Sequence, residues 1–207
     1  FHVAHMSARA SLRAVRKGKD HGVRVTCEVA PHHFTLTDEA LTAPIPYDTN
    51  TKMNPPLREV ADRDAMLAGI GDGTVDVIAT DHAPHHYDEK NVEFDRAPFG
   101  IVGLETAIPL SLDRLVHAGV IRLPRLVELM STNPARILRV PGGSLTEGSP
   151  ADITILAPEL RVRVKAADMR SRSKNTPFDG WELRGGVAAT IVGGRTLFVN
   201  PEMSLQL

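Results

Sequence analysis

The sequence predicts an α/β fold in which parallel strands alternate with helices, followed by a small β-rich region. Three strand-like runs lie between residues 1 and 80 and are separated by two segments with helical spacing. Strand–helix–strand order at this spacing is typical of parallel βαβ units. After Pro141-Gly142-Gly143 the pattern changes to short runs typical of strands. We therefore expect one domain over residues 1–140 and a second over 141–207.

Local signals set the bounds of the expected elements. The run 1–4 predicts a strand, and Ser7 is the expected N-cap of a helix over 8–21 that Gly22 ends. Because the chain opens inside a strand-like run without a Met, we expect it to be a piece of a longer protein. The dipeptide Gly193-Gly194 predicts a hairpin turn. The other expected elements are strands over 23–30, 75–80, 151–156, 161–164, 188–192 and 196–199, helices over 59–70, 104–118 and 123–130, and a short helical turn over 133–138.

Composition narrows the class of protein. The chain has 207 residues, 42% of them hydrophobic, and a net charge of -1, which is ordinary for a globular protein and argues against a nucleic-acid binder. Cys27 is the only cysteine, so an intrachain disulfide is excluded. No apolar run approaches the roughly 20 residues of a membrane span. A cytoplasmic enzyme fits these observations.

Polar residues that follow the predicted strands are the first candidates for chemistry. His5 ends the first strand, and Asp81, His82 and His85 follow the third. In α/β barrels such positions form the active site. A carboxylate at the end of an apolar strand is costly to bury unless a metal, a cation or hydrogen bonds receive it. Imidazole and carboxylate together suit zinc, although Asp81 could instead form an N-cap or an Asx turn.

Other segments have simpler interpretations that stay open. His32-His33 could be a turn pair without a ligand role, and the segment 54–58 could be a loop that its prolines make rigid. Cys27 and Glu28 alternate along the second strand, so one of them should point into the helix packing. The loop 86–96 is expected to be solvated because it is rich in charged residues.

Taken together, these residues resemble a known family, the long-chain, bacterial-type dihydroorotases. Asp81-His82-Ala83-Pro84-His85 best separates that family from the related hydantoinases and allantoinases. The resemblance covers nearly the whole chain in order. The segments that carry it are 2–7 (HVAHMS), 28–33 (EVAPHH), 52–58 (KMNPPLR), 79–85 (ATDHAPH), 97–106 (APFGIVGLET), 148–152 (GSPAD) and 175–178 (NTPF).

The resemblance implies a fold and a set of roles. The fold would be the sixth to eighth strands of a (β/α)8 amidohydrolase barrel beside a small β-sandwich. His5 matches a metal ligand, and Asp81 matches a metal ligand that also shuttles the proton. The positions that match substrate-binding residues are Asn54, His85, Phe99 and Gly100, and the implied cofactor is one or two zinc ions. His32, His33 and His82 match no ligand position.

The implied activity is the reversible hydrolysis of dihydroorotate to N-carbamoyl-aspartate in pyrimidine biosynthesis. The family's other metal ligands would precede residue 1, so we expect a C-terminal half that is inactive alone. The alternatives are another cyclic amidohydrolase, acting on hydantoins or allantoin, and a non-catalytic scaffold for aspartate transcarbamoylase. A small-molecule substrate is expected in either enzymatic case, and a homodimer and an association with the transcarbamoylase are left open.

Overall fold

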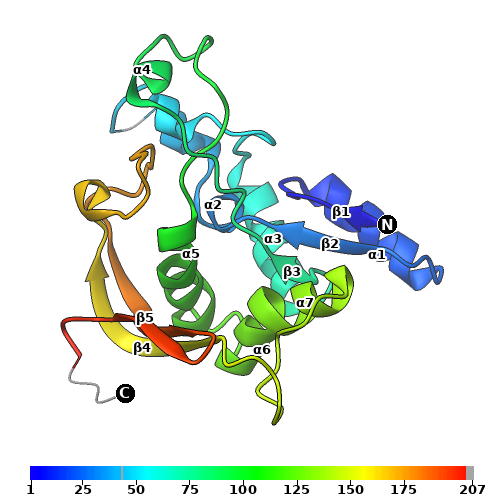
Figure 1. Cartoon of the computed structure of the whole chain (residues 1–207). Helices are drawn as coiled ribbons and strands as arrows, with labels where there is room; N and C mark the ends of the chain where they lie inside the picture. Colours follow the sequence, from blue (N-terminus) through cyan, green and yellow to red (C-terminus); the bar gives the residue numbers. More distant parts are fainter. Residues whose placement is uncertain (43, 204–207) are drawn as a thin grey trace.

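The computed structural model describes residues 1–42 and 44–203. Strands alternate with helices up to β3, and helices alone follow from α4 to α7 (Figure 1). The strands are β1 (His2–Val3), β2 (Thr26–Val29), β3 (Val77–Ile78), β4 (Ile153–Arg163), β5 (Glu182–Val192) and β6 (Arg195–Val199). The α-helices are α1 (Arg9–Asp20), α2 (Pro31–Thr35), α3 (Val60–Gly71), α4 (Tyr87–Lys90), α5 (Leu104–Ser111), α6 (Leu123–Val127) and α7 (Asn133–Leu138). The 3-10 turns are η1 (Asp38–Leu41), η2 (Thr49–Thr51) and η5 (Ala166–Asp168), and the π-helical segments are η3 (Leu112–His117) and η4 (Glu128–Thr132).

The first three strands form one parallel sheet in the order β1-β2-β3, which confirms the predicted βαβ organisation. Helices α1 and α3 pack against each other beside this sheet (Figure 1). Their approach depends on Gly69, because a Cβ at that position would lie 2.6 Å from Cδ1 of Leu12. The sheet and its helices therefore form a tightly packed layer that holds the strand ends in place.

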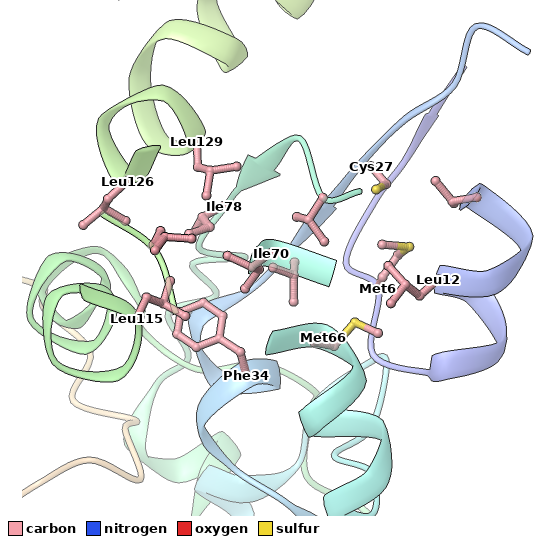
Figure 2. Packing of buried hydrophobic residues seen from close by; sticks show 14 of the residues in the cluster. Met6, Leu12, Cys27, Phe34, Met66, Ile70, Ile78, Leu115, Leu126 and Leu129 are labelled. Carbon is pink, nitrogen blue, oxygen red and sulfur yellow. The ribbon is translucent and has the colours of Figure 1, made fainter. Parts of the chain in front are cut away.

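The main hydrophobic core lies between the parallel sheet and the helices. Figure 2 shows Phe34 beside Leu115, Ile70 in the middle of the cluster, Met66 on the side of Met6 and Leu12, and Cys27 close to the side chains of α1. Cys27 points into this packing, and burial raises the pKa of its thiol to about 11. Successive strand residues face opposite sides of a sheet, so Glu28 faces away from the core, which resolves the alternative that the sequence left open.

The prediction that Ser7 is the N-cap of the first helix is wrong. The capping position belongs to Ala8, which has no side-chain cap. Ser7 is buried and its hydroxyl accepts a hydrogen bond from Nε of Arg58 at 3.4 Å, so it is engaged elsewhere. The backbone N–H of Arg9 instead donates to Asp62 of α3 at 2.9 Å. A cap supplied by a distant helix cannot be found from local sequence.

The later helices agree with the sequence, with one difference in type. The expected helix 104–118 corresponds to α5 and η3, and α6, η4 and α7 run on from one another over 123–138. The π-helical segments replace part of each expected α-helix. None of the described helices combines the length and apolar character that a bilayer crossing needs.

The C-terminal strands are longer than expected. The strands predicted over 151–156 and 161–164 are one strand, β4, whose pairing with β5 shifts register between Ala157 and Arg161. Pro158 lies in that interval and lacks the N–H that a regular ladder needs. Strand β5 begins at Glu182, six residues before the predicted start at 188. The prediction began too late because Gly185 and Gly186 lie inside the strand, and glycine weakens a strand prediction.

The hairpin between β5 and β6 is confirmed. Gly193 and Gly194 have φ angles of 54° and 75°, as a two-residue turn with positive φ at both central positions requires. Within the described residues β4, β5 and β6 form one antiparallel sheet, and α5 and η3 pack against β5 (Figure 1). The second sheet of the expected sandwich is not found among these residues.

A second hydrophobic cluster joins the two sides of the expected domain boundary. Leu57, Ile101 and Leu110 from the first part pack with Phe178 and Leu183 from the second. The division at residue 141 stays a prediction, but the two parts share this core in the structure.

Candidate functional site

The two expected metal ligands meet at the carboxyl edge of the parallel sheet. His5 follows β1 and Asp81 follows β3, and Nε2 of His5 lies 3.6 Å from Oδ1 of Asp81. Both residues have positive φ angles, 50° and 49°. Such angles are uncommon outside glycine and are often found at functional sites. The local backbone therefore turns these two side chains toward each other.

Glu28 of β2 lies behind the histidine. Its Oε1 is 2.8 Å from Nδ1 of His5, although this contact lacks the alignment of a hydrogen bond. Its Oε2 is 3.0 Å from Nε2 of His2, whose other ring nitrogen is 2.7 Å from Oγ1 of Thr26. The carboxylate is mostly buried and contacts both imidazoles. With Nδ1 facing Glu28, the His5 ring directs Nε2 toward Asp81.

These contacts fit part of a metal site. Zinc binds imidazole nitrogen and carboxylate oxygen at about 2.0–2.2 Å, so two ligand atoms 3.6 Å apart can share one ion. A carboxylate on the far ring nitrogen is the usual way in which a ligating histidine is oriented. Among the described residues, however, no three His, Cys, Asp or Glu side chains are grouped closely enough to hold a metal. The described residues thus bring together two candidate ligands, His5 and Asp81.

His82 has a different role from its neighbour Asp81. Its Nδ1 accepts hydrogen bonds from the backbone N–H groups of Gly103 at 3.0 Å and Leu104 at 3.4 Å. These groups begin α5, where backbone N–H groups have no partner within the helix. The ring therefore caps α5, which agrees with its having no assigned ligand role.

Three of the expected substrate residues come together. Nε2 of His85 donates to the backbone oxygen of Phe99 at 2.8 Å. Gly100 has a φ angle of 107°, and a Cβ on it would overlap Ala83, so only glycine fits. The backbone N–H of Gly100 donates to the backbone oxygen of Lys52 at 2.9 Å.

The segment that carries Asn54 lies against the same loops. Asn54 is exposed, two residues after Lys52, and its peptide bond to Pro55 is cis. The backbone oxygen of Pro55 accepts a hydrogen bond from Nε2 of His33 at 2.8 Å. The Lys52 bond thus holds one side of Asn54 against the Gly100 loop, and the Pro55 bond holds the other side against α2.

The expectation that the loop 86–96 is solvated is wrong for Lys90. This residue ends α4 and only 7% of its surface is exposed. Its ammonium donates to the backbone oxygens of Thr49 and Pro98, at 2.9 Å each. Burial lowers the pKa of Lys90 to about 8. Two backbone carbonyls compensate for the burial, and composition alone does not reveal such partners.

His32 and His33 belong to the short helix α2 and not to a turn. Both are buried and their rings lie edge to face, 4.2 Å apart. Burial lowers the pKa of His32 well below its usual value and that of His33 to about 4. Both rings are therefore neutral near pH 7.

The comparison with known proteins assigns the family. A model described as "Amidohydrolase family" matches residues 2–197. The chain belongs to the amidohydrolase family. It is 54% identical over 198 residues to a dihydroorotase of Geobacter metallireducens, covering 96% of this chain and 46% of that protein. It is 55% identical over 196 residues to a dihydroorotase of Pelotomaculum thermopropionicum, covering 95% of this chain and 45% of that protein. The chain spans a little under half the length of these relatives.

Solved structures of amidohydrolases have the same fold. L-hydantoinase from Arthrobacter aurescens superposes with a TM-score of 0.88 and 29% identity, over 95% of this chain and 44% of that one. Dihydropyrimidinase from Brevibacillus agri superposes with a TM-score of 0.89 and 23% identity, over 96% of this chain and 44% of that one. The α/β amidohydrolase fold expected from the sequence is thereby confirmed.

Sequence reasoning missed two residues of this region. The sequence places Glu28 in the strand beside Cys27 and in the segment 28–33 of the resemblance but assigns it no role, and its alternation with Cys27 is the available signal. Asn175 was noted only within the segment 175–178, yet its side chain contacts the loops that carry His85 and Gly100.

Proposed function

We propose that this chain forms part of a dihydroorotase, a metal-dependent enzyme that reversibly hydrolyses the cyclic amide of dihydroorotate to N-carbamoyl-aspartate. The observation that carries the proposal is the pair His5 and Asp81, 3.6 Å apart at the carboxyl edge of the sheet. The identity of 51–55% to dihydroorotases favours this substrate over other cyclic amides.

The proposal includes the finer features of the fold. Strands β1, β2 and β3 would be the sixth, seventh and eighth strands of a (β/α)8 barrel, and β4, β5 and β6 would belong to a small sandwich. The parallel order of the first three strands and the polar residues at their carboxyl ends support this assignment.

Two side chains would hold the metal and one would move the proton. A zinc ion bound by His5 and Asp81, with further ligands from outside the described residues, would lower the pKa of the attacking water and polarise the scissile carbonyl. Asp81 would accept a proton as the water oxygen adds to the carbonyl carbon. It would then donate that proton to the ring nitrogen as the carbon–nitrogen bond breaks.

The substrate would lie between the sheet edge and the loops of His85 and Gly100. Asn54, His85 and the backbone of Phe99 and Gly100 would hold its ring and carboxylate, which is a positioning contribution. A cleft of about 540 Å³ opens beside His85. Basic residues outnumber acidic ones in its lining, in which His85 is the one proposed substrate residue. The charged residues of that lining are Lys90, Arg172 and Lys174 against Asp48.

The partners and location follow from the same resemblance. A homodimer, an association with aspartate transcarbamoylase and a cytoplasmic location are supported by the likeness to dihydroorotases, and the location also by the single buried cysteine. A non-catalytic scaffold is disfavoured because both His5 and Asp81 are retained and meet.

Kinetics on a small substrate panel test the proposal. The full-length protein, loaded with zinc, is assayed with dihydroorotate, hydantoin and allantoin, and with N-carbamoyl-aspartate in the reverse direction. We expect the highest kcat/KM for dihydroorotate. A higher kcat/KM for hydantoin or allantoin would favour the second candidate, another cyclic amidohydrolase, which the hydantoinase neighbours support. No turnover of any substrate would favour the scaffold.

A further inference from the structure

Asn175 connects two loops of the candidate site with a single side chain. It lies 90 residues after His85 in the sequence and is 6% exposed. Its Nδ2 donates to the backbone oxygens of Ala83 at 3.0 Å and Gly100 at 3.2 Å. Its Oδ1 accepts from the backbone N–H of His85 at 3.3 Å. Both amide protons and the amide oxygen are therefore used.

The two loops that it joins carry the expected substrate residues. The loop after β3 carries His85, and the loop before α5 carries Phe99 and Gly100. The N–H of Ala83 donates to the oxygen of Ile101 at 2.8 Å, so the loops are already paired next to the amide of Asn175. The Asn175 bonds extend this pairing toward His85, whose Nε2 donates to Phe99.

Asn175 is itself held firmly. Its backbone oxygen accepts from the N–H of Val102 at 3.0 Å. Thr176 and Phe178 after it are buried, and Phe178 packs in the second hydrophobic cluster with its ring 5.2 Å from that of Trp181. A side chain anchored in a core imposes its geometry on the loops that it binds.

We propose that Asn175 is a positioning residue that sets His85 and the Gly100 backbone at a fixed separation for substrate. This inference rests on the proposed function, because it takes His85 and Gly100 to be the residues that hold the substrate. Asn175 does not touch the metal pair. Its loss is therefore expected to act on substrate use and to leave metal binding unchanged.

The purely structural alternative is that Asn175 is a buried amide that contributes only to stability. Asn133 provides a matched control. It is also 6% exposed, and its Nδ2 donates to the backbone oxygen of Asp76 at 2.8 Å. Asp76 precedes β3, whereas Asp81 follows it. The bond between Asn133 and Asp76 therefore lies at the end of the sheet opposite to the candidate site. The Oδ1 of Asn133 accepts from Nη2 of Arg136 at 2.8 Å. The two asparagines share burial and a bond from Nδ2 to a backbone oxygen, and they differ in which segments they join.

The first experiment compares Asn175→Asp and Asn133→Asp in the full-length, zinc-loaded protein. Aspartate keeps the acceptor and loses both donors. We expect Asn175→Asp to lower kcat/KM by on the order of 10- to 100-fold, mainly through KM, because a small misplacement of substrate-holding groups has effects of this size. Zinc content should stay at the wild-type value, and Asn133→Asp should leave kcat/KM within about twofold. Equal kinetic losses in the two variants would overturn the proposal in favour of the structural alternative.

A second experiment does not depend on the substrate. Hydrogen exchange is measured by mass spectrometry on the same variants and on Asn175→Ala, which introduces no charge. Exchange should become faster in peptides covering 82–86 and 99–103 for both Asn175 variants and remain unchanged there for Asn133→Asp. Unchanged exchange at 82–86 would overturn the proposal even if kinetics changed. If exchange becomes faster but the wild type acts on another cyclic amide, the proposed function fails and the positioning role is tested with that amide.

Discussion

His33 makes the stability of the fold depend on pH in a way that one substitution can isolate. The residue is 3% exposed, and burial lowers its pKa from 6.5 to about 4. Its Nε2 donates to the backbone oxygen of Pro55, which raises the pKa, but burial outweighs this bond, so the ring is neutral in the folded chain near pH 7. Between pH 4 and 6.5 the unfolded chain binds a proton that the folded chain does not. The free energy of unfolding is therefore expected to fall as the pH decreases through this window.

The size of the effect follows from the two pKa values. One pKa unit corresponds to about 1.4 kcal/mol, so the full loss of stability due to His33 is about 3 kcal/mol; it accumulates as the pH falls from 6.5 and is complete only below pH 4. Between pH 7.5 and pH 5 the expected loss is about 2 kcal/mol. In His33→Gln the amide can still donate to Pro55 but does not titrate, so this part of the loss should disappear. The contribution of His32, which has the same direction, remains in both proteins.

Urea unfolding at pH 5, 6 and 7.5 measures the difference, with a chelator present so that loss of metal at low pH does not contribute. The control is His21→Gln, which makes the same substitution at an exposed histidine. Parallel pH dependence in wild type and His33→Gln would refute the reasoning, because it would mean that His33 titrates equally in the folded and unfolded chains.

Three further predictions concern the site. Glu28→Gln should raise the dissociation constant for zinc by about 10- to 100-fold, since it removes the carboxylate behind His5. Competition with a chelator measures this constant. The control Asp76→Asn, at the other end of the sheet, should leave it unchanged. Asp81→Asn should abolish turnover at an unchanged melting temperature, because an amide cannot accept the proton; near-normal kcat would contradict the assigned role. Gly100→Ala should lower both kcat/KM and the melting temperature, because the φ angle of 107° is strained for alanine; unchanged thermal scans would disprove the close loop contact.

Most of the fold could be predicted because its signals are local. The strands β1, β2 and β3 are apolar runs between helical segments, and their parallel order follows from that alternation. The errors occur where a distant residue decides the local structure. Ser7 looks like an N-cap, but Asp62 supplies the partner from another helix.

Part of the candidate site could also be predicted from the sequence. His5 and Asp81 were found because strand ends of a parallel sheet meet at one edge, which is a rule of topology. Lys90 was misjudged because a charged side chain in a polar loop is usually exposed. The two carbonyls that allow its burial belong to residues 41 positions before it and 8 after it.

Glu28 and Asn175 show which part of such a site a sequence leaves undetermined. The expected ligands His5 and Asp81 follow strand ends, where topology locates them, and the resemblance to dihydroorotases supplies the expected substrate residues. The residues that orient them can be recognised only from contacts made after folding. These contacts are 2.8 Å from Oε1 of Glu28 to Nδ1 of His5 and 3.0 Å from Nδ2 of Asn175 to the backbone oxygen of Ala83. A substitution at either position keeps every expected reactive group and changes only its placement. The two variants should therefore separate in their effects, with Glu28→Gln acting on metal affinity and Asn175→Asp on substrate KM.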